Sequence, residues 1–242
     1  MAAPELLSIL VPVFNEARTV ALVIDRLMTV DLPVSREIVV INDGSSDGTR
    51  EVLDALPDRG DIVRILHAER NAGKGAAIRL GLRHARGTIV AIQDADLELD
   101  PAQLAALVAP ILGGATNVVF GSRFLAGRPD APLLTVVANR TLTMTTNLLF
   151  GARITDMETC YKIMRAEVAR ALELESNRFD IEPEITAKLL LAGHRIQELP
   201  VHFTPRRRAE GKKIGWRDGV RALRVLAGYR FGGWRPHTSE KG

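Results

Sequence analysis

The sequence predicts an α/β protein with a Rossmann-like, mostly parallel sheet flanked by helices. Three short apolar runs rich in β-branched residues, at 7–11, 37–41 and 88–92, indicate buried strands. Each run passes directly into polar, turn-forming residues. Because ligands bind at the carboxyl ends of the strands in such sheets, we expect the chemistry at this rim.

Strands and helices alternate up to about residue 122, which is typical of a doubly wound sheet. Apolar residues at helical spacing predict a helix from Val20 to Leu27, and Asp47-Gly48-Thr49 opens a second helix that Pro57 ends. The other elements of this half are a strand at 62–66, a helix from Ala76, a helix that starts at Pro101 and a strand at 117–120.

The second half is less regular. Residues 133–150 predict an apolar, threonine-rich helix that lies over an opening rather than in a core. A helix near 165–172, a helix at 185–192 and an edge strand at 196–201 follow. We find no linker that would divide the chain.

Composition limits the function further. The chain has 242 residues and a net charge of +3, but 205–242 hold eleven Lys/Arg against three Asp/Glu, so the tail carries about +8 and the rest about −5. This polarity suggests an anionic partner near the C-terminus. A single cysteine, Cys160, excludes an intrachain disulfide and suits a reducing cytoplasm. No apolar run reaches the ~20 residues of a membrane span, so we expect a cytoplasmic protein that is soluble or peripheral at the inner face of the membrane.

Three carboxylates follow the strand at 88–92: Asp94, Asp96 and Glu98. Carboxylate oxygens suit a hard divalent cation, which would neutralise a departing diphosphate. The alternative is that these acids only cap the helix that begins near Pro101. Their position after a buried strand favours the metal.

Two glycine-containing loops are candidates for nucleotide recognition. In 42–49, Asp43 could accept a hydrogen bond from a base or ribose, whereas the alternative is an ordinary turn and helix cap. Gly73-Lys74-Gly75 could hold a phosphate at a helix start, although it lacks the P-loop spacing.

Together these residues resemble the family 2 glycosyltransferases with the GT-A fold, and most of all their dolichyl- or polyprenyl-phosphate mannose/glucose synthase branch. The matching segments occur in the family's order and cover roughly 5–215; they are 11–16, 42–49, 71–76, 94–97 and 121–123. The resemblance implies a glycosyltransferase domain at 1–215, with a nucleotide-sugar half at 1–123 and an acceptor half at 124–215. It leaves 216–242 as a basic amphipathic helix and tail.

The resemblance also implies roles for single residues. Pro12, Val13, Glu16 and Asp43 would hold the nucleoside of a nucleotide-sugar donor, Asp94 and Ala95 would meet its ribose and diphosphate, and Lys74 would add a cation there. Asp96 would ligate Mg²⁺ or Mn²⁺ together with Asp94 and Glu98. Arg123 would pair with the acceptor phosphate. Glu98 departs from the family, which often has Gln there, and Asn42 stands where many relatives have Asp.

The acceptor decides whether a base is needed. A polyprenyl phosphate is already ionised near neutral pH and can attack without losing a proton. A hydroxyl acceptor would need a general base, for which Asp156 or Glu158 are candidates. The structural alternative for Asp156 is a helix cap or an ion pair with Arg153 or Lys162.

The basic tail also bears on whether the acceptor is a phosphate. Residues 205–213, with Arg206 and Lys212, resemble a loop that closes over donor and acceptor phosphates; the alternative is a solvated basic run. Arg217, Arg221 and Arg224 share one helical face, which suits an anionic membrane surface.

We therefore expect an inverting, metal-dependent transfer of mannose or glucose from GDP-mannose or UDP-glucose to a polyprenyl phosphate. A hydroxyl acceptor is the alternative, and a non-catalytic nucleotide-binding module or a nucleotidyltransferase is a more distant one. A nucleotidyltransferase usually needs a glycine-rich basic segment after its first strand, where this chain has the acidic segment 12–16. The acidic body and 5% aromatic content disfavour nucleic acid. Donor base, sugar, lipid length and oligomeric state stay open.

Overall fold

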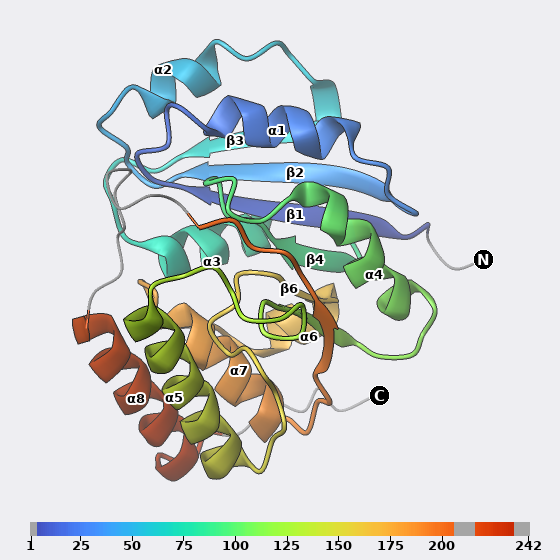
Figure 1. The fold of residues 1–242 in the computed structure, drawn as a ribbon. Coiled ribbons are helices and arrows are strands. Elements are labelled where there is room, and N and C mark those ends of the chain that lie inside the picture. The colour runs from blue at the N-terminus through green and yellow to red at the C-terminus, as the bar shows by residue number, and fades with distance from the viewer. Residues whose placement is uncertain (1–3, 206–215, 235–242) are drawn as a thin grey trace.

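The computed structural model of the chain describes residues 4–205 and 216–234. Within them one sheet of seven strands, in the order β3-β2-β1-β4-β6-β5-β7, organises the molecule. The strands are β1 Leu6–Val13, β2 Ser35–Asn42, β3 Val63–His67, β4 Ile89–Ile92, β5 Val118–Ser122, β6 Lys162–Arg165 and β7 Gln197–Pro200. The expected α/β fold is confirmed (Figure 1).

The sheet is mixed. β3, β2, β1 and β4 are parallel neighbours, and β7 is parallel to β5 at the other edge. β6 lies between β4 and β5 and is antiparallel to both. The sequence prediction placed only a helix near this segment, and that helix follows as α6 Ala166–Ala171.

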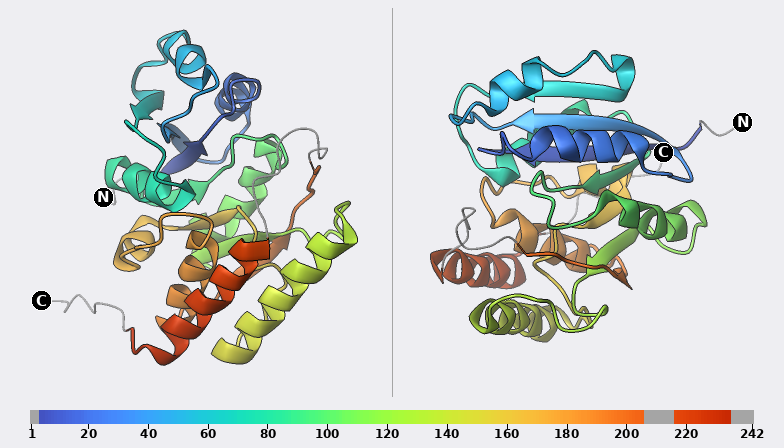
Figure 2. Two further views of the ribbon diagram at one scale, coloured as in Figure 1. Left: turned by 90° about the vertical axis from the view of Figure 1, so that its left-hand side faces the viewer. Right: turned by 45° about the horizontal axis from the view of Figure 1, so that its top comes forward.

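Helices cover both faces of the sheet, as the left panel of Figure 2 shows, with α1 and α4 on one side and α3 and α6 on the other. The buried residues Val20, Val23, Ile24 and Leu27 form the inner face of α1, as their spacing predicts. Besides α6, the helices are α1 Val20–Thr29, α2 Thr49–Asp54, α3 Lys74–His84, α4 Leu104–Leu112, α5 Leu133–Phe150, α7 Ile181–Leu191 and α8 Trp216–Phe231, with 3-10 turns at η1 Gly60–Ile62 and η2 Pro101–Gln103.

A second, smaller hydrophobic cluster joins α5, α7 and α8 at the end of the molecule away from α2 and β3 (Figure 1). Leu142 of α5 packs there with Ala222 and Leu226 of α8. None of the helices in the described part of the chain has both the length and the apolar character that crossing a membrane requires.

Candidate active site

Two loops at the carboxyl ends of β1 and β2 are joined by hydrogen bonds. The amide of Asn15 donates to Ser45 Oγ at 2.9 Å, and the amide of Ser46 donates to Asn15 Oδ1 at 2.9 Å. The amide of Glu16 donates to Thr49 Oγ1 at 2.9 Å. Asn15 has a φ of 57°, a left-handed conformation that non-glycine residues seldom adopt outside turns and functional sites.

The residues expected to hold a nucleoside lie at this rim. Pro12 and Val13 end β1, with Val13 buried, and Glu16 is buried just beyond them. The hydroxyl of Thr19 lies 3.0 Å from Glu16 Oε2 and 2.7 Å from the carbonyl oxygen of Ala95. The structure therefore brings Pro12, Val13, Glu16 and Ala95 to one place; their contact with a donor stays a prediction.

Asp43 is saturated by protein contacts. Its carboxylate accepts hydrogen bonds from the amide of Ala72 at 2.9 Å, the amide of Gly73 at 2.7 Å and Nδ2 of Asn71 at 2.8 Å. The amide of Asp43 donates to the carbonyl of Val13 at 2.8 Å. Asp43 thus ties the ends of β1 and β2 to the loop before α3, which accounts for its burial without a bound donor.

The glycines around Lys74 are explained by packing. Gly73 has a φ of 102°, and a Cβ on it would collide with the carbonyl oxygen of Asn177; a Cβ on Gly75 would collide with that of Ser176. These glycines let the first turn of α3 approach the segment before α7. The amide of Gly73 is already used by Asp43 and is not available to a phosphate; contact of Lys74 with a phosphate stays a prediction.

Lys74 belongs to a row of alternating charges that is buried at Lys162 and Glu182 and partly exposed at Asp94. Its Nζ lies 2.8 Å from Asp94 Oδ1 and 2.9 Å from Glu182 Oε1, and Lys162 pairs with the other oxygen of Glu182. Burial alone would lower the pKa of Lys74, but the negative groups around it, Asp94 first and Glu182 among the others, together outweigh burial and raise that pKa well above its ordinary value. Although burial opposes it, the charge of Lys74 keeps the pKa of Asp94 below its ordinary value.

The carboxylate segment after β4 is a turn of its own. Asp96 Oδ1 accepts from the amide of Glu98 at 3.1 Å, and Leu97 between them has a φ of 63°. The helix cap is a different residue, Asp100, whose Oδ1 accepts from the amide of Ala102 at 3.0 Å. The capping alternative for the preceding acids therefore does not hold.

The three predicted metal ligands do not form a ready-made cluster. Among residues 4–205 and 216–234, no three histidine, cysteine or acidic side chains come together as a metal-binding group. Asp94, Asp96 and Glu98 still offer only oxygen atoms, the donors that a hard cation prefers, at the strand end where a diphosphate is expected. This suits a cation held by one or two carboxylates plus the phosphates of a donor.

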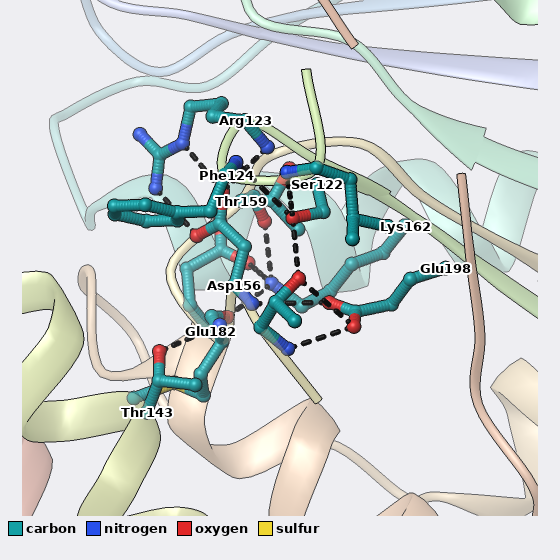
Figure 3. A network of polar contacts seen from close by, with 12 residues as sticks. Ser122, Arg123, Phe124, Thr143, Asp156, Thr159, Lys162, Glu182 and Glu198 are labelled. Atoms are coloured by element: carbon teal, nitrogen blue, oxygen red, sulfur yellow. Dashed lines mark hydrogen bonds and ion pairs between the residues drawn. The ribbon is translucent and has the colours of Figure 1, made fainter. Parts of the chain in front are cut away.

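Arg123 and Asp156 form a bidentate ion pair beside this rim (Figure 3). Nε and Nη2 of Arg123 lie 2.7 and 2.8 Å from the two oxygens of Asp156, and the amide of Arg123 adds a third hydrogen bond at 3.0 Å. Asp156 is fully buried, and its partner is neither Arg153 nor Lys162. The pair uses two of the five N–H donors of the guanidinium, and the side chain of Arg123 stays partly exposed.

Glu198 fixes the segment that carries Asp156. Its carboxylate accepts from the amide of Thr155 at 2.7 Å and from the amide of Asp156 at 3.0 Å. Burial raises the pKa of Glu198 despite these hydrogen bonds. Phe203 packs against the guanidinium of Arg123, 5.3 Å from ring centre to Cζ, so Arg123 is held by this ring as well as by Asp156.

Glu158 is an acid near this pair that keeps a buried oxygen and has a raised pKa. Its Oε1 is buried and has no hydrogen-bond partner among the described residues. Burial, and then the charge of Glu182, raise the pKa of Glu158 to about 7. A carboxyl group with this proton affinity can exchange a proton near neutral pH.

The chain approaches the carboxylates once more before the basic run. The amide of Thr204 donates to the carbonyl of Glu98 at 2.9 Å, and Phe203 forms a bridge with Leu99. Arg206 and Lys212, the predicted acceptor-binding cations of the tail, lie outside the described residues.

Sequence reasoning assigned no role to Glu182 or Glu198, and it named Lys162 only as a partner of Asp156. A charged residue inside an apolar helix or strand was the available signal, since Glu182 and Lys162 both occur in such segments and are buried. The sequence could not show which opposite charge each one meets.

Comparison with known proteins agrees with this arrangement. The family model described as Glycosyl transferase family 2 matches residues 8–172. Glycosyltransferase AglD of Haloferax volcanii is 29% identical over 206 residues, which are 82% of this chain and 33% of that protein. Undecaprenyl-phosphate mannosyltransferase of Micrococcus luteus is 28% identical over 224 residues, 89% of this chain and 90% of that protein. The chain thus spans a third of the first relative and most of the second.

A solved structure shares the fold. Glucosyl-3-phosphoglycerate synthase from Mycobacterium tuberculosis, in complex with Mn²⁺, uridine diphosphate and phosphoglyceric acid, superposes with a TM-score of 0.69 at 18% identity. The match covers 93% of this chain and 77% of that one. At this identity the likeness concerns the fold alone.

Proposed function

Because this chain belongs to glycosyl transferase family 2 and has the GT-A fold, we propose that it transfers a hexose from a nucleotide sugar to the phosphate of a polyprenyl phosphate. The relatives named undecaprenyl-phosphate mannosyltransferase and polyprenol monophosphomannose synthase, the second from Mycolicibacterium smegmatis and 29% identical over 220 residues, support the acceptor class. The donor would be GDP-mannose or UDP-glucose.

The observation that carries the acceptor is the Arg123–Asp156 pair. Asp156 is buried and both of its oxygens are bound by Arg123, so it is badly placed to remove a proton from a hydroxyl. Arg123 is partly exposed and keeps further donors for an anion. An acceptor phosphate needs a cation to position it and no base, which is what this pair offers.

Donor binding is proposed for the opposite side of the rim. Pro12, Val13 and Glu16 would border the nucleoside, and Asp43 would act indirectly by holding the loops around it. Lys74 would face the diphosphate from the first turn of α3. Attack by the acceptor oxygen and departure of the nucleoside diphosphate in a single displacement would invert the anomeric carbon.

A divalent cation, Mg²⁺ or Mn²⁺, is proposed to enter with the diphosphate and to neutralise its growing negative charge. Asp96, with Asp94 and Glu98, would hold it. Lys74 pairs with Asp94 at 2.8 Å and so keeps this carboxylate ionised and in place.

A hydroxyl acceptor remains the second candidate, because Glu158 has a pKa of about 7 and an unpartnered oxygen. The two functions are separated by comparing a polyprenyl phosphate with the polyprenol of equal length. We expect GDP or UDP to be released from a donor panel only when the phosphate is present. Release with the alcohol alone, lost in Glu158→Gln, would replace the proposed function with the second.

A further inference from the structure

The apolar surface of this protein is concentrated on two helices. The described part of the chain leaves eleven large hydrophobic side chains exposed, and eight of them lie on α5 and α8. The eight are Leu133, Leu134, Val137, Met144 and Leu148 of α5, and Val220, Leu223 and Phe231 of α8. The two helices lie side by side in both panels of Figure 2, so this is one continuous part of the molecule.

On α5 the exposed residues form a narrow stripe, which we call the α5 stripe: Leu134, Val137, Thr141, Met144 and Leu148. Successive members are three or four residues apart, so they share one helical face, and the buried residues of α5 lie on the opposite face. Leu134 is 80% exposed and Leu148 is 78% exposed. The stripe therefore does not contribute to the hydrophobic core.

The polar groups of this face are internally satisfied. The hydroxyl of Thr141 donates to the carbonyl of Val137 at 2.9 Å, and that of Thr145 donates to the carbonyl of Thr141 at 2.9 Å. The threonines thus present their methyl groups without unmet hydrogen bonds. Moving such a face from water to an apolar environment therefore costs little desolvation free energy for its hydroxyl groups.

The charge of the two helices that carry the exposed apolar residues is mostly positive. The charged residues of α5 and α8 are five arginines, one in α5 and four in α8, against the single acid Asp218. Arg221 and Arg224 are exposed on α8. An apolar stripe beside arginines complements a bilayer with anionic headgroups, whereas a second copy would place like charges against each other.

We propose that the α5 stripe, flanked by the arginines of α8, inserts into the headgroup region of an anionic lipid bilayer. The biological purpose of this contact rests on the proposed function, whereas the exposed residues and charges that support it do not. Arg140 of α5 packs over Phe124, the neighbour of Arg123, and Thr143 of α5 accepts a hydrogen bond from the amide of Met157, the neighbour of Asp156. α5 therefore connects the stripe on its outer face with the segments that carry Arg123 and Asp156 on its other sides.

Vesicle flotation tests the surface. The full chain is mixed with vesicles of phosphatidylcholine alone or with added phosphatidylglycerol. We expect it to float with the anionic vesicles, and we expect the double variant Leu134→Glu/Leu148→Glu to bind about tenfold or more weakly. Leu22→Glu is the matched control, since Leu22 is a 45% exposed leucine on α1, and should bind like the parent chain.

A second arm separates this inference from the proposed function. Transfer to a short, water-soluble prenyl phosphate should be the same in the parent chain and in Leu134→Glu/Leu148→Glu, whereas transfer to a long-chain acceptor in anionic vesicles should fall with the double variant.

Equal flotation of the parent chain and the double variant would overturn the proposed membrane-binding surface. So would concentration-dependent dimerisation that the double variant abolishes, because the stripe would then be an interface between copies. Failure of transfer to every prenyl phosphate, with flotation as expected, would instead overturn the proposed function alone.

Discussion

Two glutamates with buried carboxylate oxygens show how hydrogen bonding sets proton affinity in this molecule. Glu184 accepts from the amides of Glu175 and Ser176 and pairs with Lys188, and although burial opposes it, its pKa is lowered. Glu158 has a buried oxygen with no partner among the described residues, and its pKa is raised to about 7. The difference follows from the number of donors that each carboxylate meets.

Glu158→Gln should change how stability depends on pH. Glu158 binds its proton more tightly in the folded chain than in the unfolded chain, where its pKa is near 4.5, so folding is penalised progressively as pH rises from 4.5 through about 7. Removing the charge should stabilise the variant more at pH 8 than at pH 5, by up to about 3 kcal/mol. Urea unfolding at both pH values measures this. Glu184→Gln is the control: the pKa of Glu184 is lowered, so the effect of this variant on stability should be nearly the same at pH 5 and pH 8.

Asp96→Ala should abolish metal-dependent transfer and leave the fold intact. A loss of about 100-fold or more is expected, because charge neutralisation at the diphosphate contributes several kcal/mol. Asp100→Ala is the matched control: Asp100 caps η2, so this variant should lose about 1 kcal/mol of stability and keep its activity. Full activity of Asp96→Ala with Mg²⁺ or Mn²⁺ would remove Asp96 from the metal site.

At the scale of elements, loops from distant parts of the sequence are joined by single side chains. Asp43 holds the loop before α3 through three hydrogen bonds, and Glu198 of β7 holds the segment of Asp156. The amide of Asp43 also donates to the carbonyl of Val13, and Lys74 of α3 pairs with Asp94 after β4, so the ends of β1, β2 and β4 form one connected rim rather than three independent turns.

Asp43→Ala should destabilise the chain and weaken donor binding together. It leaves the donors of Asn71, Ala72 and Gly73 without their acceptor, at a cost of about 3 kcal/mol. Urea unfolding gives the first effect and a thermal shift with GDP or UDP gives the second. Asp61→Ala, at a carboxylate that is 94% exposed, should change neither. Loss of binding without loss of stability would point instead to direct contact between Asp43 and the nucleoside.

Much of the element pattern could be predicted because it is local. The helix expected at 133–150 has those bounds, since its apolar periodicity continues up to Gly151, which has a φ of 66° and suits a helix end. β6 could not be predicted in the same way. It has four residues and owes its strand conformation to insertion between β4 and β5, which the local sequence does not encode.

The site was predictable in its location and less so in its contacts. The polar strand ends placed Asp94, Asp96, Asp43 and Arg123 near one rim, as parallel topology requires. The pairing of Arg123 with Asp156, 33 residues away, depends on how the second half packs. The same is true of Lys74 and Glu182.

At the scale of the whole molecule, a row of alternating charges connects the first and second parts of the chain. Lys74 and Asp94 lie before β5, and Lys162 and Glu182 lie after it. Each charge is stabilised by the next, so the row makes the placement of the two parts depend on electrostatics as well as on packing.

Lys162→Met should therefore be strongly destabilising. The variant removes one of the two lysines that pair with Glu182, and it leaves the carbonyls of Met157 and Thr159 without their donor. The free energy of unfolding should fall by about 3 kcal/mol or more. Adding Glu182→Gln should recover part of the loss, since the buried charge is then reduced. Chemical unfolding of both single variants and the double variant measures this coupling; strictly additive losses would contradict it.

The most direct measurement of the central claim is mass spectrometry of the product formed when the purified chain meets GDP-mannose or UDP-glucose, Mn²⁺, and an equal mixture of a polyprenyl phosphate and the polyprenol of the same length. We expect a polyprenyl phosphate enlarged by one hexose, with the alcohol untouched and no product in Asp96→Ala. Hexose on the alcohol, or transfer to neither lipid while both nucleotide sugars bind, would contradict the account.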